Sequence, residues 1–554
     1  MTRRPSFSPA LSARVQRPAF FSIASVVIVA CLFVDSAVAQ GGGELRFCLH
    51  SEPKTFNPLL VEDDASESIR YLTGGVLVRM NRQTQGLEPE LAQSWEVSKD
   101  SRQIAFKLRT GIAFSDGTPF SAEDVAYTVQ QLMDPALHSP TGDAFRSGPG
   151  NVETKIISPS QISITFPAAV AGLDRLFDQV AIVSAHSPKK EMAVLGPFVM
   201  ADYKAGSSVL LKRNPNYWKS DAQGRKLPYL DSIALEIQPT RDVEMLRFKR
   251  GEIDLINALD SEYYDKLAAT SPQQVHDAGP SLDGEEVWFN EVAKAPIQAY
   301  KRAWFRSANF RKGISQAINR EDLSRVVFHG HAQPAVGAVS PANKFWFNAK
   351  LKPEVYSPDT ALKTLQADGF HMDNGVLKDR DGSAVVFSII TNSGNKYREQ
   401  MAVMIQDDLQ KIGVHVNLVT LDFPSLIARM TQTFDYEAIL LGVTNVDLDP
   451  NGEMNLWLSS SENHQWNPQQ KTPETPWEAE IDKLMRAQAS SADAAKRKEA
   501  FDRVQEIVYE QAPFIFLINK NALSAVSTVV HGASPVILHP QTFWNAEQLT
   551  VVRK

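Results

Sequence analysis

The chain has 554 residues, which is too long for one hydrophobic core, so we expect roughly two to four domains. A hydrophobic fraction of 43%, a charged fraction of 22% and a mean hydropathy of -0.23 are typical of a soluble globular protein rather than a disordered one. The net charge of -7 argues against a nucleic-acid binder, because such a protein needs a basic face to displace counterions from phosphates.

Residues 1–39 are predicted to be an export signal that is removed on maturation. Arginines precede an apolar run over Ala19–Val34, and the small residues of Ala37–Ala39 suit a signal peptidase. The run is shorter than the roughly 20 apolar residues that span a bilayer. Ile28–Cys31 offers an alternative, a lipoprotein processing box in which Cys31 becomes the lipidated first residue. Either route predicts a periplasmic protein, free or anchored to the membrane through Cys31.

The first half of the mature chain carries both strand and helix patterns. Leu45–Leu49 is the first predicted strand, and Ala65–Leu77 has the spacing of a helix. In Ile104–Leu108, apolar residues alternate with polar ones, which predicts a strand with one buried face. The next predicted helix begins at Ser121, which can cap it together with Asp124 three residues later.

The second half carries a strand–helix–strand pattern followed by further strands. Val385–Ile390 and Val414–Leu418 are apolar strands on either side of a predicted helix. That helix has one apolar face, formed by Tyr397, Met401, Ile405, Leu409 and Ile412. This order predicts two parallel strands in a buried sheet. Ala438–Leu441 is the next strand, a long helical pattern follows Trp477, and Gln511–Asn519 is the final buried strand.

The stretch Tyr436–Trp457 leads from a buried strand into a polar loop. Gly442 lets the backbone turn after the strand without steric cost. The loop then offers hydrogen-bonding side chains at Thr444, Asn445, Asp447 and Asp449. Ligands of open α/β sheets bind beyond the carboxyl ends of strands, so this loop could hold an ammonium group or a hydroxyl-rich solute. A solvated turn that closes the sheet is the alternative interpretation.

Several segments, taken in order, resemble a known family. They read SEPKTFNP at 51–58, LEPELAQSWEV at 87–97, FKLRTGIAFSDGTPFSAEDV at 106–125, GPFVMADYKAGSSVLLKRNPNYW at 196–218 and WFNEVAKAP at 288–296. Together they resemble the extracytoplasmic solute-binding proteins of peptide-type ABC importers, which are the dipeptide- and oligopeptide-binding proteins of solute-binding protein family 5. The resemblance extends over most of the mature chain.

The resemblance implies an α/β fold, a two-lobed periplasmic-binding-protein clamshell with an extra subdomain inserted in the first lobe. Lobe I would comprise residues 44–287 plus 511–554, with the inserted subdomain at about 86–189. Lobe II would comprise residues 288–510. The resemblance further implies a monomer that binds a small solute, expected to be a peptide, between its lobes. The closed form would be recognised by an ABC permease and ATPase complex at the inner membrane.

The resemblance also indicates candidate ligand-binding residues. They are Glu52, Val443, Thr444, Asn445, Asp447 and Asp449. In this family, peptide binders typically have an aromatic residue after the glycine at position 442 and, four residues after that glycine, an aspartate that pairs with the peptide's α-amino group. Here those two positions hold Val443 and Val446, and the nearest carboxylates belong to Asp447 and Asp449. A peptide ammonium would therefore face Asp447 or Asp449.

No P-loop, H-E-x-x-H, G-x-S-x-G or C-x-x-C motif occurs, so we expect no catalytic residue, no metal site and no cofactor. His329 and His331 are interpreted as loop histidines, and Lys496–Lys498 as a solvated helix face. The tryptophans predicted to pack in the core or at its rim are Trp304, Trp346, Trp457, Trp466 and Trp544.

Three alternatives to a peptide importer component stay open. The same fold could bind a non-peptide solute such as an oligosaccharide, an opine or a metal complex, as the valines at 443 and 446 suggest. The chain could be a secreted hydrolase, although the usual motifs are missing. It could also be a sensor or folding helper that captures ligands without importing them.

Overall fold

The computed structural model describes residues 42–146, 150–188, 192–444 and 448–553. The predicted export signal, with Cys31, lies outside the described residues, and so do Asn445 and Asp447 of the candidate site. Within the described ranges, no helix is long and apolar enough to cross a membrane.

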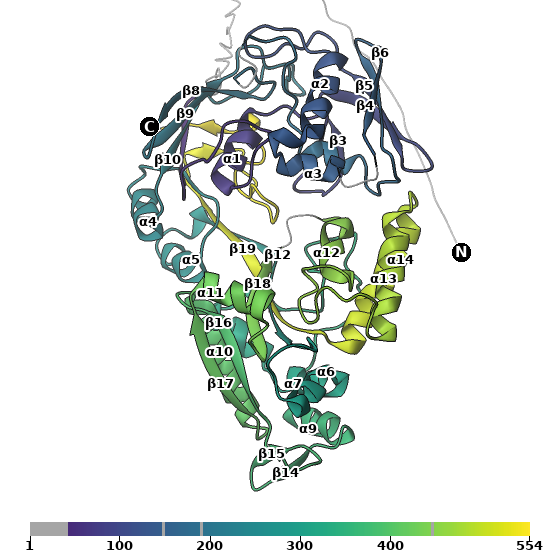
Figure 1. The fold of residues 1–554 in the computed structure, drawn as a ribbon. Coiled ribbons are helices and arrows are strands. Elements are labelled where there is room, and N and C mark those ends of the chain that lie inside the picture. The colour runs from purple at the N-terminus through teal and green to yellow at the C-terminus, as the bar shows by residue number, and fades with distance from the viewer. Residues whose placement is uncertain (1–41, 147–149, 189–191, 445–447, 554) are drawn as a thin grey trace, which may run out of the picture. The chain divides into compact units, whose positions relative to one another are not determined.

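An 11-stranded mixed sheet runs through the molecule (Figure 1). Along one path its strands are β17 (His415–Leu421), β16 (Val386–Asn392), β18 (Ala438–Thr444), β12 (Val275–Phe289), β19 (Phe514–Val526), β11 (Leu255–Ile256), β1 (Glu44–Leu49), β10 (Ser232–Ile237), β9 (Ser208–Arg213) and β8 (Phe198–Lys204). One further strand, β13 (Ala332–Pro334), pairs with β19 off this path.

The two long strands β12 and β19 connect the two halves of this sheet. They pair with each other along their length, and their ends have different neighbours. At one end Val526 of β19 pairs with Leu255 of β11, and at the other end Phe289 of β12 pairs with Ala438 of β18. The ladder is irregular around Pro280, because proline has no N–H to donate.

The predicted strand–helix–strand unit is confirmed. Strands β16 and β17 are parallel, with Val386 opposite His415, and α10 (Lys396–Gln410) connects them. The helix begins after Asn395, whose side chain accepts a hydrogen bond from the backbone N–H of Arg398. The apolar face of α10 is buried against the sheet. In the sheet, β18 lies between β16 and β12.

A separate four-stranded antiparallel sheet packs with α2 (Ala122–Met133). Its strands are β4 (Ala92–Val97), β5 (Gln103–Leu108), β7 (Gln161–Thr165) and β6 (Glu153–Ser158). The predicted cap of α2 is confirmed, because Ser121 and Asp124 satisfy each other's backbone N–H groups in a capping box.

The predicted helix over Ala65–Leu77 is too long at its C-terminal end. The observed helix, α1 (Asp64–Thr73), stops before Gly74, whose N–H bonds to the carbonyl of Arg70. Gly74 is followed by a second glycine, and Gly196 packs closely against the carbonyl of Thr73. The apolar spacing typical of a helix continues in the sequence to Val76, but the chain leaves the helix at Gly74, whose backbone is extended.

The remaining helices pack around these sheets, and the remaining short strands pair in twos. They are α3 (Pro140–Arg146), α4 (Arg241–Lys249), α5 (Ser261–Ala268), α6 (Ala299–Arg306), α7 (Ala308–Gln316), α8 (Arg320–Asp322), α9 (Pro358–Ala367), α11 (Phe423–Ala428), α12 (Met454–Trp457), α13 (Pro476–Ala489), α14 (Ala494–Gln511), β2 (Val78–Met80), β3 (Leu87–Pro89), β14 (His371–Asp373), β15 (Val376–Lys378), β20 (Val530–His531) and β21 (Thr550–Val551).

The apolar side chains gather in several distinct clusters. One lies within residues 59–195, another surrounds β1, β9 and β10, and two cover opposite faces of the β16–β18–β12 region. Residues 41–554 nevertheless form one compact unit, so the lobe boundaries stay a prediction. The prediction for the tryptophans is confirmed: Trp304, Trp346, Trp457 and Trp466 are buried, and Trp544 packs partly buried at the edge of a cluster.

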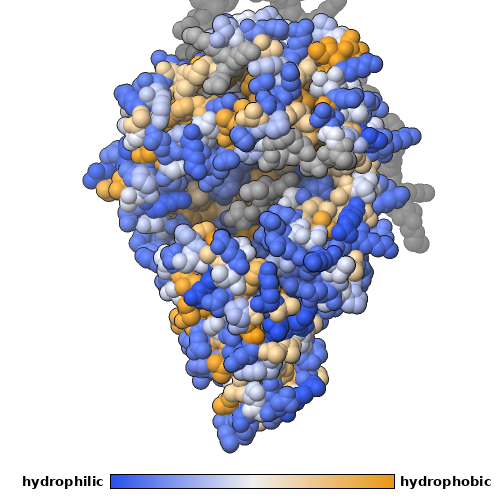
Figure 2. Space-filling view, viewed as in Figure 1, coloured by the Kyte–Doolittle hydropathy of each residue, from blue (hydrophilic) through white to orange (hydrophobic). Residues whose placement is uncertain are grey.

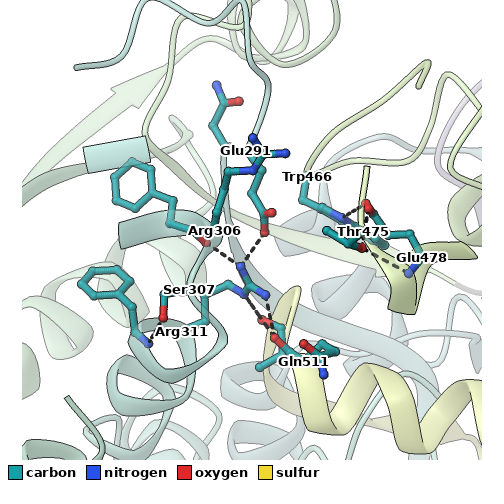
Figure 3. A network of polar contacts seen from close by, with 12 residues as sticks. Glu291, Arg306, Ser307, Arg311, Trp466, Thr475, Glu478 and Gln511 are labelled. Atoms are coloured by element: carbon teal, nitrogen blue, oxygen red, sulfur yellow. Dashed lines mark hydrogen bonds and ion pairs between the residues drawn. The ribbon is translucent and has the colours of Figure 1, made fainter. Parts of the chain in front are cut away.

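A buried polar network ties the end of β12 to the C-terminal helix (Figure 3). On α7, Arg311 donates to the Glu291 carboxylate at 2.7 Å and to the carbonyl of Gln511 at 2.8 Å. Beside it, Glu478 at the start of α13 accepts hydrogen bonds from Thr475 and Trp466. These contacts hold the helices that pack below β12 and β18.

Candidate functional site

The carboxyl end of β18 lies beside the middle of β12. Val443 pairs with Gly284, and Gly284 in turn pairs with Asn519 of β19. A small cavity opens here, with room of about 30 Å³ for water-sized groups. It is lined by Leu282, Gly284, Glu285, Glu286, Ala335, Gly337, Ala338, Ser340, Val443, Glu453, Leu456, Trp457, Phe514, Phe516, Ile518 and Asn519.

Three glutamates line this cavity, and two of them are adjacent on β12. Glu285 is neutralised by Arg398, whose Nε lies 2.8 Å from the carboxylate, and by Lys520, whose Nζ lies 3.2 Å away. Successive residues of a strand face opposite sides of the sheet, so Glu286 is directed away from these two cations.

Glu286 is only 6% exposed. Within the described part of the chain, neither a hydrogen-bond donor nor a cation contacts its carboxyl group. Burial, followed by the negative charges of Glu285 and Glu453, raises the pKa of Glu286 to about 8. The third glutamate, Glu453, accepts a hydrogen bond of 2.8 Å from the indole N–H of Trp457. The cavity therefore either carries excess negative charge, when Glu286 is ionised, or holds a proton on Glu286.

The sequence-predicted residues of the loop are only partly brought to this cavity. Val443 lines it, and Thr444 is the last residue of β18. Asn445 and Asp447 lie outside the described residues. Asp449 is buried and does not line the cavity.

Asp449 forms a bidentate ion pair with Arg497 of α14. The two terminal nitrogens of the guanidinium lie 2.9 and 2.5 Å from the two carboxylate oxygens. Asp449 also accepts the backbone N–H of Asn451 and so caps the short turn that follows. The prediction of a solvated face over Lys496–Lys498 is wrong for Arg497, which is 5% exposed, because its guanidinium is satisfied by Asp449 and by Gln488.

Glu52 lies elsewhere and does not line the cavity. Its exposed carboxylate accepts hydrogen bonds from the hydroxyl of Tyr203 and from the backbone N–H of Gly206. The Tyr203 hydroxyl, followed by the Gly206 N–H, lowers the pKa of Glu52. In this structure Glu52 secures the turn between β8 and β9, and a contact with solute stays a prediction.

Polar and apolar contacts connect the N-terminal segments to the chain around the cavity. The side-chain amide of Gln85 donates to the carbonyl of Ala342 at 2.6 Å and accepts from the backbone N–H of Lys344 at 3.1 Å. Asn451 donates to the carbonyl of Ala171 at 3.0 Å. Met80, Leu448 and Leu538 form a small apolar cluster nearby. The segment after β18 is thereby held against residues from the first third of the chain.

Sequence reasoning missed Glu286 and Glu453 as site residues. A signal was present, since two adjacent acids interrupt the apolar end of β12 in GEEVWF at 284–289. His329 and His331 both contact Asp265, at 2.6 and 3.1 Å, which agrees with their interpretation as loop histidines. No group of three or more His, Cys, Asp or Glu side chains within the described residues could hold a metal ion.

The chain matches one family model and many known proteins. The model of bacterial extracellular solute-binding proteins, family 5, matches residues 86–465. A probable ABC transporter-binding protein of Deinococcus radiodurans is 26% identical over 546 residues, with 89% of this chain and 89% of that protein covered. The oligopeptide-binding protein AppA of Bacillus subtilis is 23% identical over 527 residues, again with 89% of each chain covered.

Solved structures share the fold at low sequence identity. The ABC transporter substrate-binding protein CtaP of Listeria monocytogenes superposes with a TM-score of 0.77 at 21% identity, covering 93% of this chain and 100% of that chain. NikA of Brucella suis in complex with Fe(III)-EDTA gives a TM-score of 0.76 at 20% identity, covering 92% of this chain and 100% of that chain. The predicted α/β periplasmic-binding-protein fold is confirmed.

Proposed function

This chain belongs to the bacterial extracellular solute-binding proteins of family 5, and we propose that it captures a peptide or peptide-like solute for an ABC importer. The observation that carries the proposal is the family match over residues 86–465. The family comprises binding proteins rather than enzymes. The name of the Bacillus subtilis relative, an oligopeptide-binding protein, supports a peptide as the solute.

The geometry supports binding between two lobes that close over the solute. Lobe I comprises residues 44–287 plus 511–554, with an inserted subdomain at about 86–189, and lobe II comprises 288–510. The two chain crossings between these segments, at 287–288 within β12 and at 510–511 just before β19, act as the hinge. The solute stabilises the closed form only through contacts that the open form lacks, such as a simultaneous grip by both lobes. The closed monomer then docks on the permease and ATPase complex.

The solute lies at the carboxyl end of β18, where ligands of α/β sheets bind. Val443, Thr444 and the loop residues Asn445 and Asp447 contact it, and Glu52 borders the site. Asp449 supports the loop indirectly rather than contacting the solute, because its carboxylate is bonded to Arg497 in this structure. The protein reaches the periplasm through the export signal at 1–39.

Two measurements test the proposal. Mass spectrometry of the solute released on denaturing protein purified from its own host should identify a peptide, and isothermal titration with a peptide library should then give heat for that class. A protein that releases no solute and gives no heat with any peptide class would contradict peptide capture. Intact mass of the exported protein decides between cleavage after Ala39 and lipidation of Cys31.

A non-peptide solute is the second candidate. Val443 and Val446 stand where peptide binders of this family typically have an aromatic residue and an acid. The structurally similar NikA of Brucella suis was solved with Fe(III)-EDTA, so this fold is not confined to peptides. Release of an oligosaccharide, an opine or a metal complex in the same mass-spectrometric experiment would favour this candidate.

A further inference from the structure

The cavity beside β18 contains the carboxyl group of Glu286, for which the described residues supply no hydrogen-bond donor and no cation. Glu286 lines the cavity, is 94% buried and, among the residues that the structure describes, contacts neither a donor nor a cation. A buried polar group without a partner costs free energy, and such groups in native proteins call for an explanation. For Glu286, one such explanation is that a ligand supplies the missing hydrogen-bond donor.

The charges around the cavity favour a cation. Its titratable lining residues are Glu285, Glu286 and Glu453. Arg398 and Lys520 both bond to Glu285, which faces the other side of β12 from Glu286. Glu453 accepts from Trp457 and still lies close enough to Glu286 to raise its pKa. A positive group entering the cavity would therefore meet one acid directly and a second one close by.

The size of the cavity narrows the chemistry of that cation. About 30 Å³ is enough for one or two water-sized groups. A primary ammonium is compact and carries three donors, whereas a guanidinium is a broad planar fork. Val443, Leu456 and Trp457 form an apolar part of the wall, against which the carbon attached to the ammonium can pack.

We propose that this cavity receives a primary ammonium group of the solute, with Glu286 as its acceptor and Glu453 as a second negative charge. The inference rests on the proposed solute-binding function and specifies the chemistry of the solute. The ammonium belongs either to the amino terminus of a peptide or to a side chain such as that of lysine. This site takes the place of the acid that is missing at Val446.

Ammonium binding is coupled to the proton on Glu286. In the solute-free protein the carboxyl group keeps its proton up to about pH 8, and a bound ammonium favours the ionised form. The proton is therefore released on binding, and affinity should increase as the pH rises from 6 toward 8. Burial, followed by the negative charges of Glu285 on the opposite side of β12 and of Glu453 at the cavity, disfavours the ionised form of Glu286 and so contributes to this dependence.

The test is isothermal titration of four probes into solute-free protein at pH 8. The probes are Ala-Lys-Ala, Ala-norleucine-Ala and the N-acetylated form of each, which separate the two sources of the ammonium. Glu286→Gln should weaken the binding of the probes whose ammonium enters the cavity roughly thirtyfold or more, because a desolvated charge pair is lost, and leave the probe without any ammonium group unchanged. Glu499→Gln, on the exposed face of α14, removes the same charge away from the cavity and should change nothing.

The outcomes separate this inference from the proposed function. Equal affinity of the wild type and Glu286→Gln for every ammonium-bearing probe would overturn the ammonium site while leaving peptide capture intact. If the wild type binds no peptide at all, the peptide function fails, and n-butylammonium against n-butanol then tests the cavity alone. In that case butylammonium should raise the melting temperature of the wild type and not that of Glu286→Gln, and an equal shift in both would refute the proposal.

Discussion

Arg497 and Asp449 form a buried bidentate ion pair that joins helix α14 to the loop after β18. Both residues are at most 5% exposed, and the carbonyl and the side-chain amide oxygen of Gln488 accept two further hydrogen bonds from the guanidinium. The ring of Trp346 also lies against the guanidinium, 5.0 Å from its centre. This pair positions the chain that follows β18, so the geometry of the site depends on a helix that begins about 50 residues later in the sequence.

The first prediction concerns this pair. Arg497→Met should lower the free energy of unfolding by about 3 to 5 kcal/mol, because it leaves the Asp449 carboxylate buried without its cation. Urea denaturation followed by circular dichroism measures the change. Lys496→Met, at the exposed neighbouring position, should have little effect. Adding Asp449→Asn to Arg497→Met should recover part of the loss, and a double variant no better than the single one would contradict this account.

The second prediction concerns the cost of burying Glu286. The folded protein holds its proton up to about pH 8, whereas the usual pKa of a glutamate is 4.5. Below about pH 4.5, burying Glu286 therefore does not lower the free energy of unfolding. As the pH rises toward 8, burying Glu286 lowers the free energy of unfolding by an increasing amount, at most about 5 kcal/mol. Glu286→Gln should stabilise the solute-free protein increasingly from pH 5 to pH 8.

Thermal melts across that pH range test the second prediction. Glu499→Gln serves as the control, because its carboxylate is exposed and should give a difference from wild type that does not change with pH. A stability difference for Glu286→Gln that is the same at pH 5 and pH 8 would show that burial does not hold the proton on Glu286.

The third prediction has the opposite sign and concerns Glu478. Burial raises its pKa, but hydrogen bonds from His464, Thr475 and Gln470 outweigh burial and lower the pKa to about 2. The stabilisation is complete above the usual pKa of 4.5 and is lost as the pH falls toward 2. Glu478→Gln should therefore cost roughly 3 kcal/mol at pH 7 and much less at pH 2.5.

Denaturant titrations at the two pH values measure this difference. Glu480→Gln lies on the same helix, but Glu480 is exposed and pairs with the surface residue Arg503, so its effect should be small at both pH values. A loss for Glu478→Gln that persists unchanged at pH 2.5 would point to lost packing rather than lost charge.

The fourth prediction concerns the contact of Gln85 with residues 342–344. If these hydrogen bonds stabilise the closed form, Gln85→Gly should weaken solute binding by roughly five- to thirtyfold, since two hydrogen bonds contribute about 1 to 2 kcal/mol. Glycine is the matched choice, because Gln85 has a positive φ of 64° that glycine adopts without strain. The measurement is isothermal titration with the solute identified by mass spectrometry.

A control variant separates closure from local damage. Lys344→Met removes the bond from its ammonium to the carbonyl of Gln83 and keeps both Gln85 hydrogen bonds, because the Lys344 donor to Gln85 is a backbone N–H. It should affect binding much less than Gln85→Gly. Equal affinities for the wild type and Gln85→Gly would mean that this contact does not contribute to the closed form.

Local patterns predicted much of the fold. Alternation and helical spacing identified β16, α10, β17 and β18, and the capping residues at 121 and 124 identified the start of α2. Helices and strands of this kind are determined mainly by residues close together in the sequence, so the local sequence is enough to predict them. The C-terminal end of α1 was misjudged, because the spacing continued across Gly74 while the close packing of Gly196 required the chain to turn. The surface agrees with the soluble-protein composition of the sequence, because hydrophilic residues dominate the face in Figure 2 and hydrophobic ones form small groups.

The site was predicted less well, for a physical reason. The strand end at Val443 followed from a local pattern, but the environment of each acid depends on residues far away in sequence. Asp449 looked like a free ligand-binding acid, and the tertiary structure pairs it with Arg497. Glu285 and Glu286 are adjacent in sequence, but the structure gives cations to Glu285 and none of the described ones to Glu286.

By itself, the sequence determined the family and the order of the elements, and it predicted the strand after which the candidate site lies. Only the tertiary structure decided which carboxylates are neutralised and which one faces an open cavity. The reason is that the state of a buried charge is set by the groups packed around it, and those groups come from β12, β18, β19 and the turn before α12, which are adjacent only in the folded chain.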